Sequence, residues 1–310
     1  MRKIIIENLK KETSLSKYML LKFPNLSKGS LYKALRNKDI KVNEKRINKD
    51  VILNSNDKLE IYISDNILFN LPKSINYIYE DKNIAVVFKP QGILSNNEEK
   101  PIEEPTLEDL VKKENPGYII CHRLDRNTAG LIIFAKNDIS YNAILCGFKN
   151  NNITKEYIAY VAYSSFKNNE DTLVQYISTD KINGKSKIFN LNDNIKENNV
   201  KKITTSYKVI YTNTKDDFSI LKIFIHNGKT HQIRAVLSNL GHPIIGDSKY
   251  GKNGINKKFN KSRQLLFAVS YNFNFEENSH LCYLNKKNIS LADNYYMNYI
   301  GDIYEKVTES

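Results

Sequence analysis

Segments with the pattern of short β-strands outnumber helical segments in most of this chain of 310 residues. Apolar and β-branched runs predict strands at 76–79, 84–88, 131–135, 157–161, 204–211 and 219–225. In the same region, helical spacing of apolar residues predicts helices only at 140–148 and 231–239. Because these helices do not alternate regularly with the strands, a doubly wound parallel sheet is disfavoured. We expect an α+β fold with a mainly antiparallel sheet.

The first 63 residues predict a separate small α/β domain. One helix is expected from Leu15 to Phe23, with Ser14 as its N-cap, and another from Gly29 to Asn37. Short strands are expected at 41–43 and 58–63. This domain carries 15 Lys and Arg against 7 Asp and Glu, so it holds +8 of the chain's net charge of +13. Such a concentration of positive charge indicates a polyanionic partner and predicts a small basic RNA-binding domain.

The remaining chain predicts a linker, one large domain and a tail. Residues 64–75 contain Pro72 and show little periodicity, as expected of a linker. Residues 76–303 form the strand-rich domain, and 304–310 a tail. The chain has no run of about 18 apolar residues and no signal peptide, so we expect a soluble, cytoplasmic protein with no membrane association. Its three cysteines are widely spaced and indicate reduced thiols rather than a disulfide framework.

The segment 121–137 has the densest group of polar side chains next to an apolar strand. It contains His122, Arg123, Asp125, Arg126, Asn127 and Thr128 within seven positions. A polar loop held against a buried strand is a common setting for a catalytic site. The flanking guanidinium groups favour the charged form of Asp125, which suits it to act as a nucleophile or a base. The alternative is a salt-bridged turn in which Gly130 takes a special backbone angle.

A second segment, 226–251, predicts a tight turn at Gly228 followed by a helix. Thr230 is the expected N-cap, and Arg234 lies about one turn into that helix, where it could point at an anion. His226, His231 and His242 invite a metal-binding interpretation. Their spacing is irregular and no acidic cluster accompanies them, so we expect structural histidines instead.

A third segment, 153–161, predicts a strand on which Lys155, Tyr157 and Ala159 share one face. Tyr157 is either a core aromatic side chain or a platform on which a nucleobase stacks.

Taken together, these segments resemble the RluA-type ribosomal large subunit pseudouridine synthases. Residues 122–130 match the His-Arg-Leu-Asp-x-x-Thr-(Ser/Ala)-Gly signature of that family, and 78–94 match its opening motif. Lys155 and Tyr157 match the strand with the family's active-site tyrosine. Residues 228–234, 241–247 and 250–251 match the motifs that follow. The matches occur in the family's order and extend from about residue 76 to residue 275.

The resemblance implies an RNA pseudouridine synthase that acts on 23S ribosomal RNA, as a monomer, without cofactor or metal. Asp125 would be the essential carboxylate, as nucleophile or as base. Arg234 would pair with it, and Tyr157 would stack on the uracil. Arg123 would help to fill the gap left by the flipped uridine. The further RNA-binding positions are His122, Arg126, Thr128, Lys155, Lys229, His231, Gln232 and Lys89.

The N-terminal domain resembles the RNA-binding domain named after ribosomal protein S four, through its two helices and residues 40–46. Lys38 and Asp39 stand where that domain usually has a glycine turn. The large domain departs from the family pattern in three places. Lys229 replaces an arginine, Phe267 replaces a histidine, and 95–96 replace a histidine-containing continuation.

Three other functions remain open from the sequence. A non-catalytic RNA-binding ribosome assembly factor would share the fold without the reaction. A metal-dependent nuclease would use His122, Asp125 and His231. A membrane-surface protein would need a basic amphipathic helix, and no segment has that pattern.

Overall fold

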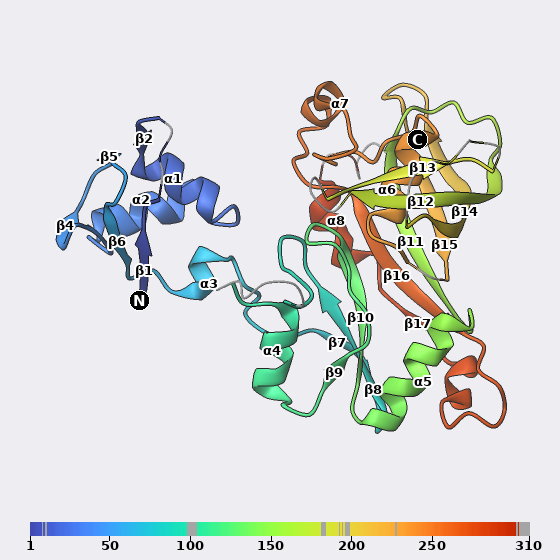
Figure 1. The fold of residues 1–310 in the computed structure, drawn as a ribbon. Helices are drawn as coiled ribbons and strands as arrows, with labels where there is room; N and C mark the ends of the chain where they lie inside the picture. The colour runs from blue at the N-terminus through green and yellow to red at the C-terminus, as the bar shows by residue number, and fades with distance from the viewer. Residues whose placement is uncertain are drawn as a thin grey trace. The chain divides into compact units, whose positions relative to one another are not determined.

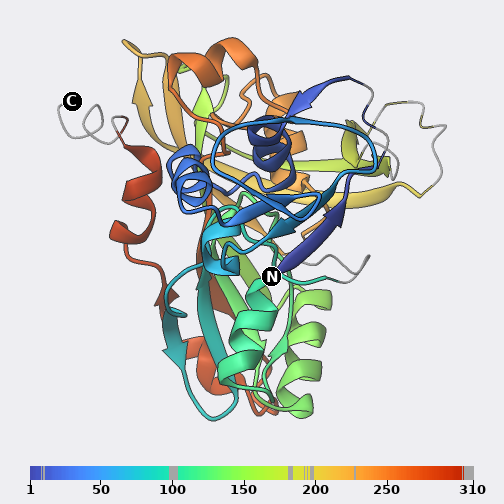
Figure 2. The same ribbon diagram turned by 90° about the vertical axis from the view of Figure 1, so that its left-hand side faces the viewer.

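The structure is a computed structural model that divides into two compact units (Figures 1 and 2). It describes the chain except residues 8, 10, 98–103, 181–183, 192, 194, 196–198, 227, 302 and 304–310. The tail expected at 304–310 therefore lies outside the described residues. The first unit holds Met1–Ser74 with Glu104 and Pro105, and the second begins at Ile75 and holds the rest.

The first unit is a small sheet with two helices. Its four-stranded antiparallel sheet has the order β1 (Arg2–Ile5), β6 (Lys58–Ile61), β3 (Ile40–Val42), β4 (Lys45–Ile47), and β2 (Thr13–Ser14) pairs with β5 (Ile52–Leu53). The helices are α1 (Leu15–Lys22) and α2 (Lys28–Arg36). Both helices confirm the sequence predictions, and the Ser14 side chain accepts from the Lys17 N–H as the predicted N-cap.

The turn after α2 shows how this unit accommodates the missing glycine. Lys38 has a φ of 60°, the left-handed conformation that glycine adopts most easily. The Arg46 guanidinium donates to the Lys38 carbonyl at 2.6 Å and so supports this turn from the neighbouring hairpin. A side-chain contact thus maintains a backbone conformation that the residue type disfavours.

Residues 64–74 of the linker predicted at 64–75 belong to the first compact unit. Residues Asp65–Leu68 form helix α3. Leu68 and Phe69 are buried in the core of the unit, and the Phe69 ring lies 5.6 Å from the Phe23 ring, edge to face. Two adjacent apolar residues give no clear period, which is why their burial was not predicted from the sequence.

The second unit is built on one long sheet. Its strands are β7 (Tyr77–Glu80), β8 (Ile84–Lys89), β9 (Ile119–Ile120), β10 (Ala129–Ala135), β11 (Ile153–Ala162), β12 (Glu170–Asp180), β13 (Lys185–Phe189), β14 (Lys201–Asn213), β15 (Phe218–Ile225), β16 (Leu266–Phe273) and β17 (Ile289–Ser290). The main path runs β13-β12-β14-β15-β11-β16-β10-β8-β7. Every pair is antiparallel except β10 with β16. The predicted mainly antiparallel α+β fold is confirmed.

Two helices cover this sheet near its opposite ends in Figure 1. Helix α5 (Asp138–Lys149) buries Ile144 and Phe148 in the main core. Helix α6 (Gln232–Asn239) places Val236 in a separate cluster with Ile177 and Ile203 of the neighbouring strands. The other helices are α4 (Leu107–Glu114), α7 (Asn253–Lys258), η1 (Cys282–Lys286) and α8 (Asn294–Ile300). Within the described part of the chain, no helix is long and apolar enough to cross a bilayer.

The parallel contact between β10 and β16 depends on a glycine. Gly130 has a φ of 131°, and a Cβ at this position would lie 2.2 Å from the Ala268 carbonyl oxygen. The special backbone angle expected at Gly130 is therefore present. The close approach brings β16 against the start of β10, immediately after the loop that carries Asp125.

Candidate active site

The loop that carries Asp125 lies between β9 and β10 and is fixed to the segment after β8. Ser95 accepts a hydrogen bond from the Leu124 N–H and donates one to the Leu124 carbonyl, each at 2.9 Å. The Gly92 N–H donates to the Arg126 carbonyl at 2.8 Å, and the Arg126 side chain donates to the Gly92 carbonyl at 3.3 Å. Both neighbours of Asp125 are thus held by main-chain contacts, which fixes the base of its side chain.

Lys89 stabilises the same loop from beneath. Its fully buried ammonium donates to the carbonyls of Pro90, Ile93 and Arg126 at 3.0, 2.9 and 3.0 Å. Burial lowers the pKa of Lys89 to about 7, while the charge of Asp125 acts in the opposite direction. Three carbonyl acceptors match the three N–H donors of an ammonium group. The sequence placed Lys89 among the RNA contacts, whereas the structure places it underneath the catalytic loop.

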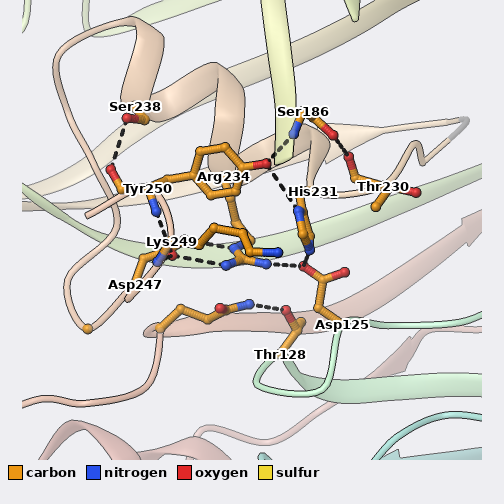
Figure 3. A network of polar contacts seen from close by, with 12 residues as sticks. Asp125, Thr128, Ser186, Thr230, His231, Arg234, Ser238, Asp247, Lys249 and Tyr250 are labelled. Atoms are coloured by element: carbon orange, nitrogen blue, oxygen red, sulfur yellow. Dashed lines mark hydrogen bonds and ion pairs between the residues drawn. The ribbon is translucent and has the colours of Figure 1, made fainter. Parts of the chain in front are cut away.

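Arg234 connects Asp125 to a second carboxylate (Figure 3). Its Nη1 donates to Asp125 Oδ2 at 2.7 Å, while Nε and Nη2 donate to the two oxygens of Asp247 at 2.7 and 2.9 Å. Asp247 is fully buried and also accepts from the N–H groups of Lys249 and Tyr250. Burial works to raise the pKa of Asp247, but bonding to Arg234 outweighs it and holds that pKa below its usual value. The same pairing raises the pKa of Arg234 despite burial.

His231 lies beside the ion pair and corrects one prediction. It is the N-cap of α6 in place of Thr230, and its φ of 56° is a left-handed conformation that is unusual for a side chain of this size. Its Nε2 is 3.8 Å from Asp125 Oδ2, and its Nδ1 is 3.0 Å from the Tyr250 hydroxyl. Burial, with the nearby positive charges, lowers the pKa of His231 although Asp125 opposes this shift. The ring is therefore mainly neutral near pH 7.

Tyr157 extends from β11 on the buried side of the sheet. The register of β11 against β16 shifts between Glu156 and Tyr157, so a bulge precedes the tyrosine. Burial raises the pKa of Tyr157, and the charge of Asp125 raises it further, which places the two groups within electrostatic reach. The described residues supply no hydrogen bond to the Tyr157 hydroxyl. A neutral phenol with an unengaged hydroxyl is thus available to a substrate near Asp125.

Two further predicted positions form a separate group. The Ile133 N–H donates to His122 Nε2 at 3.1 Å, so His122 is held against the strand that follows the loop. Burial lowers the pKa of His122 well below its usual value. Lys155 places its Nζ 4.1 Å from the centre of the Phe148 ring, and burial with the charge of Lys229 lowers the pKa of Lys155 to about 8. These side chains are packed at the base of the site.

The remaining predicted residues divide into internal and exposed positions. Thr128 accepts from the Gln264 amide at 2.8 Å, and the Gln232 amide donates to the Thr205 hydroxyl at 3.0 Å; these four side chains are buried. Arg123 is exposed. Thr128 and Gln232 therefore shape the site from inside.

The structure does not gather the histidines that invited a metal interpretation. His226 lies 3.1 Å from the Thr154 hydroxyl, and His242 stacks on Phe166 with ring centres 3.7 Å apart. Within the described ranges, no group of three or more His, Cys, Asp or Glu side chains is placed to hold a metal ion.

Two residues of the network were not predicted from the sequence as part of the site. Asp247 and Tyr250 belong to motifs that matched the family pattern, but no role was assigned to them. The sequence feature that could have pointed to them is the Gly246-Asp247 pair, close to the Tyr250-Gly251 pair. A carboxylate in such a segment predicts a charged partner, since an unpaired buried charge is costly.

The arrangement around Asp125 suits this carboxylate to act as a nucleophile or as a base. Oδ2 of Asp125 faces Arg234 and His231, whereas Oδ1 has no hydrogen-bond partner among the described residues. The carboxyl side chain is 28% exposed, so it can be reached from solvent. A charged oxygen oriented by a guanidinium can attack an electrophilic carbon or remove a proton. Tyr157 is buried within electrostatic reach of this carboxylate.

Comparison with known proteins identifies the chemistry that uses this arrangement. The family model described as RNA pseudouridylate synthase matches residues 83–239. The chain belongs to the RNA pseudouridylate synthase family. It is thus an RNA pseudouridine synthase, and both Asp125 and Arg234 fall within the matched segment.

The sequences of individual relatives match this chain over most of its length. An uncharacterized RNA pseudouridine synthase of Mycoplasma capricolum is 32% identical, covering 93% of this chain and 96% of the relative. The ribosomal large subunit pseudouridine synthase C of Rickettsia bellii is 31% identical, covering 81% and 86%. Among solved structures, human RNA pseudouridylate synthase domain containing 1 shares the fold with a TM-score of 0.58 at 21% identity, covering 74% of this chain and 86% of that one.

We predict that Asp247→Asn impairs both stability and catalysis. It leaves Arg234 with one charged partner and removes a buried ion pair, so unfolding free energy should fall by about 3 kcal/mol or more. A shift of Arg234 by about 1 Å would lower kcat on the order of 100-fold. Urea denaturation and single-turnover pseudouridine formation measure the two effects.

As a control, Glu108→Gln removes the exposed pair with Lys112 (2.6 Å) and should cost less than about 1 kcal/mol. Equal effects of the two variants would contradict the prediction.

The lowered pKa of Lys89 predicts a pH dependence of stability. Its pKa is about 7 in the folded protein and near the ordinary 10.5 when unfolded, so between these values only the unfolded chain binds the proton. Stability contributed by this group therefore rises with pH above 7, by at most about 1.4 kcal/mol per pH unit. The difference in unfolding free energy between wild type and Lys89→Met should increase from pH 7 to pH 9. A constant difference would show that the three carbonyls and Asp125 keep the ammonium charged.

Proposed function

We propose that this RNA pseudouridine synthase modifies uridines of 23S ribosomal RNA, with Asp125 as its catalytic carboxylate. The observation that carries the assignment of Asp125 is its ion pair with Arg234, which leaves one oxygen free beside Tyr157. Relatives from Rickettsia bellii and Borreliella burgdorferi bear the names ribosomal large subunit pseudouridine synthase C and D, which supports ribosomal RNA as substrate. A non-catalytic assembly factor would have no need for the paired carboxylate.

The reaction breaks the bond between C1′ of the ribose and N1 of uracil, turns the base and joins C1′ to C5. The C5 proton leaves and N1 gains a proton, so no redox partner is required. Asp125 acts by attacking C1′ or by removing a sugar proton during cleavage. Arg234 keeps the carboxylate charged and oriented, and Tyr157 stacks against the uracil and relays a proton through its hydroxyl.

We assign the other predicted residues to two roles. Exposed Arg123 contacts RNA and fills the space of the flipped uridine. Arg126, Lys229 and His231 line the entrance with positive or polar groups. The internal positions His122, Lys155, Thr128, Gln232 and Lys89 hold these groups in place rather than contacting the RNA backbone.

We further propose that the first unit is a basic RNA-binding domain of the ribosomal protein S four type. One face of α2 supports this, because Lys28, Tyr32 and Arg36 recur at intervals of four and are all exposed, whereas Leu31 and Leu35 are buried. Cations beside an aromatic ring suit a phosphodiester chain with stacked bases.

We propose that the enzyme acts as a monomer; the ion pairs of Arg234 with Asp125 and with Asp247 form within one chain and need no second copy. It works in the cytoplasm, where an enzyme of ribosomal RNA meets its substrate during ribosome assembly.

We expect Asp125→Asn to abolish pseudouridine formation while RNA binding stays within about threefold, because the substitution keeps the shape and removes the reacting charge. Pseudouridines mapped in 23S RNA from cells with wild-type protein, with the variant and with neither give the measurement. A site present only with wild-type protein identifies the target. Modification undiminished in the variant would contradict the role of Asp125, and an unchanged map without the protein would contradict the ribosomal substrate.

For the first unit, the double variant Lys28→Gln, Arg36→Gln should weaken RNA binding and reduce its dependence on salt. Each phosphate contact contributes about 0.7 to the slope of log K against log salt on a single strand, so a loss of about 1.4 is expected. Lys286→Gln, Lys287→Gln is the matched control, since it removes two exposed positive charges after η1. An equal change in both double variants would contradict a specific role for α2.

A further inference from the structure

A pocket of about 630 Å³ opens next to the Asp125 network and shares Tyr250 with it. It is lined by residues 178–180 of β12, 185–187 of β13 and Tyr250. Its volume lies in the range typical of sites for small organic ligands. Tyr250 is the one lining residue that also contacts His231, which connects the pocket to the environment of Asp125 (Figure 3).

The wall of the pocket is held firmly to the segments that position Arg234. The Ser186 N–H donates to the Tyr250 hydroxyl at 2.6 Å, and the Ser186 hydroxyl donates to the Thr230 carbonyl at 2.7 Å. The Lys249 ammonium donates to the Gly184 carbonyl at 2.9 Å. Three hydrogen bonds thus join the β12–β13 hairpin to residues on either side of α6. These bonds fix the position of the pocket wall.

The lining has the chemistry of a nucleotide site. Lys185 and Lys187 are exposed, and Asp180 is the one carboxylate among the described residues that line the pocket. Lys185 places its Nζ 5.9 Å from the centre of the Tyr250 ring. Neighbouring strands add the hydroxyl groups of Ser178 and Thr179. Positive charge and hydroxyl groups bind phosphodiester oxygens, and an aromatic ring offers a stacking surface to a base or a ribose.

We propose that this pocket binds a nucleotide adjacent to the target uridine, with its phosphodiester at Lys185 and Lys187 and its base or ribose against Tyr250. When one uridine enters the site at Asp125, the chain on either side of it must continue along the protein surface. The pocket is reached from Asp125 through two contacts, at 3.8 Å to His231 and 3.0 Å onward to Tyr250. Contacts to flanking nucleotides contribute to substrate choice in enzymes that extrude a base.

This inference rests on the proposed function only in requiring an RNA substrate, and it does not depend on which RNA that is. The tests therefore use a short RNA in which wild-type protein has been shown to form pseudouridine. If that RNA proves to be transfer RNA, the proposal of a ribosomal target fails, while the pocket is tested unchanged.

The first test uses wild-type protein and leaves folding intact. The RNA carries 4-thiouridine one nucleotide before or after the target, is irradiated in the complex, and the cross-linked peptide is identified by mass spectrometry. We expect a cross-link to Tyr250 or to residues 184–187 from at least one of the two positions. Cross-links from both positions that fall only elsewhere would overturn the proposal.

The second test measures how much Lys185 and Lys187 contribute to RNA binding and to turnover. Lys185→Gln, Lys187→Gln should raise KM about tenfold with kcat within about twofold, and should reduce the salt slope of RNA binding by about 1.4. Lys286→Gln, Lys287→Gln again removes two exposed charges, from residues that do not line the pocket. If the hairpin variant matches this control in KM and in salt slope, the pocket does not bind RNA.

Discussion

The candidate active site depends on the ion pairs that the Arg234 guanidinium forms with two carboxylates. It meets Asp125 on one side and both oxygens of Asp247 on the other. A single carboxylate would leave much of this planar cation unsatisfied in a buried position, and desolvating it would be costly. The second carboxylate is fully buried and fixes the plane of the guanidinium. Asp125 therefore meets a donor already aligned, and its other oxygen stays available for chemistry.

Around this ion pair, the protein tolerates unusual local geometry. His231 begins α6 in a left-handed conformation, which is sustained by the Tyr250 hydroxyl and by the position of Asp125. Lys89 is completely buried, yet it donates to Arg126 within the loop and to Pro90 and Ile93 in the segment after β8, and so joins the two. Both cases place a locally unfavourable group next to Asp125 or beneath the loop that carries it.

Much of the fold follows from periodicity in the sequence, while its long-range contacts do not. Runs of apolar and β-branched residues identified β8, β10, β14 and β15, and the N-cap at Ser14 marked the start of α1. The pairing of Asp125 with Arg234 was implied by resemblance, because no local pattern relates residues 109 positions apart. The N-cap of α6 was misplaced at Thr230, since cap preferences describe side chains and not the tertiary contacts that hold His231.

The departures from the family pattern are accommodated by neighbours that the sequence could not reveal. Ser95 stands where a histidine-containing continuation is usual, and it makes two hydrogen bonds to Leu124 that fix the loop. Phe267 stands where a histidine is common, and its ring stacks against Tyr296 in the core, 5.1 Å between centres. Lys229 keeps a positive charge close enough to lower the pKa of Lys155.

The separation of 109 residues between the two partners also has a consequence during synthesis. Asp125 leaves the ribosome long before Arg234, and Asp247 follows later still. A nascent chain ending before residue 234 can form the first unit and several strands, since domains fold as they emerge. It has no cation to orient the catalytic carboxylate. With Asp125 as the proposed catalytic carboxylate, the enzyme becomes competent only after Arg234 and Asp247 have been translated.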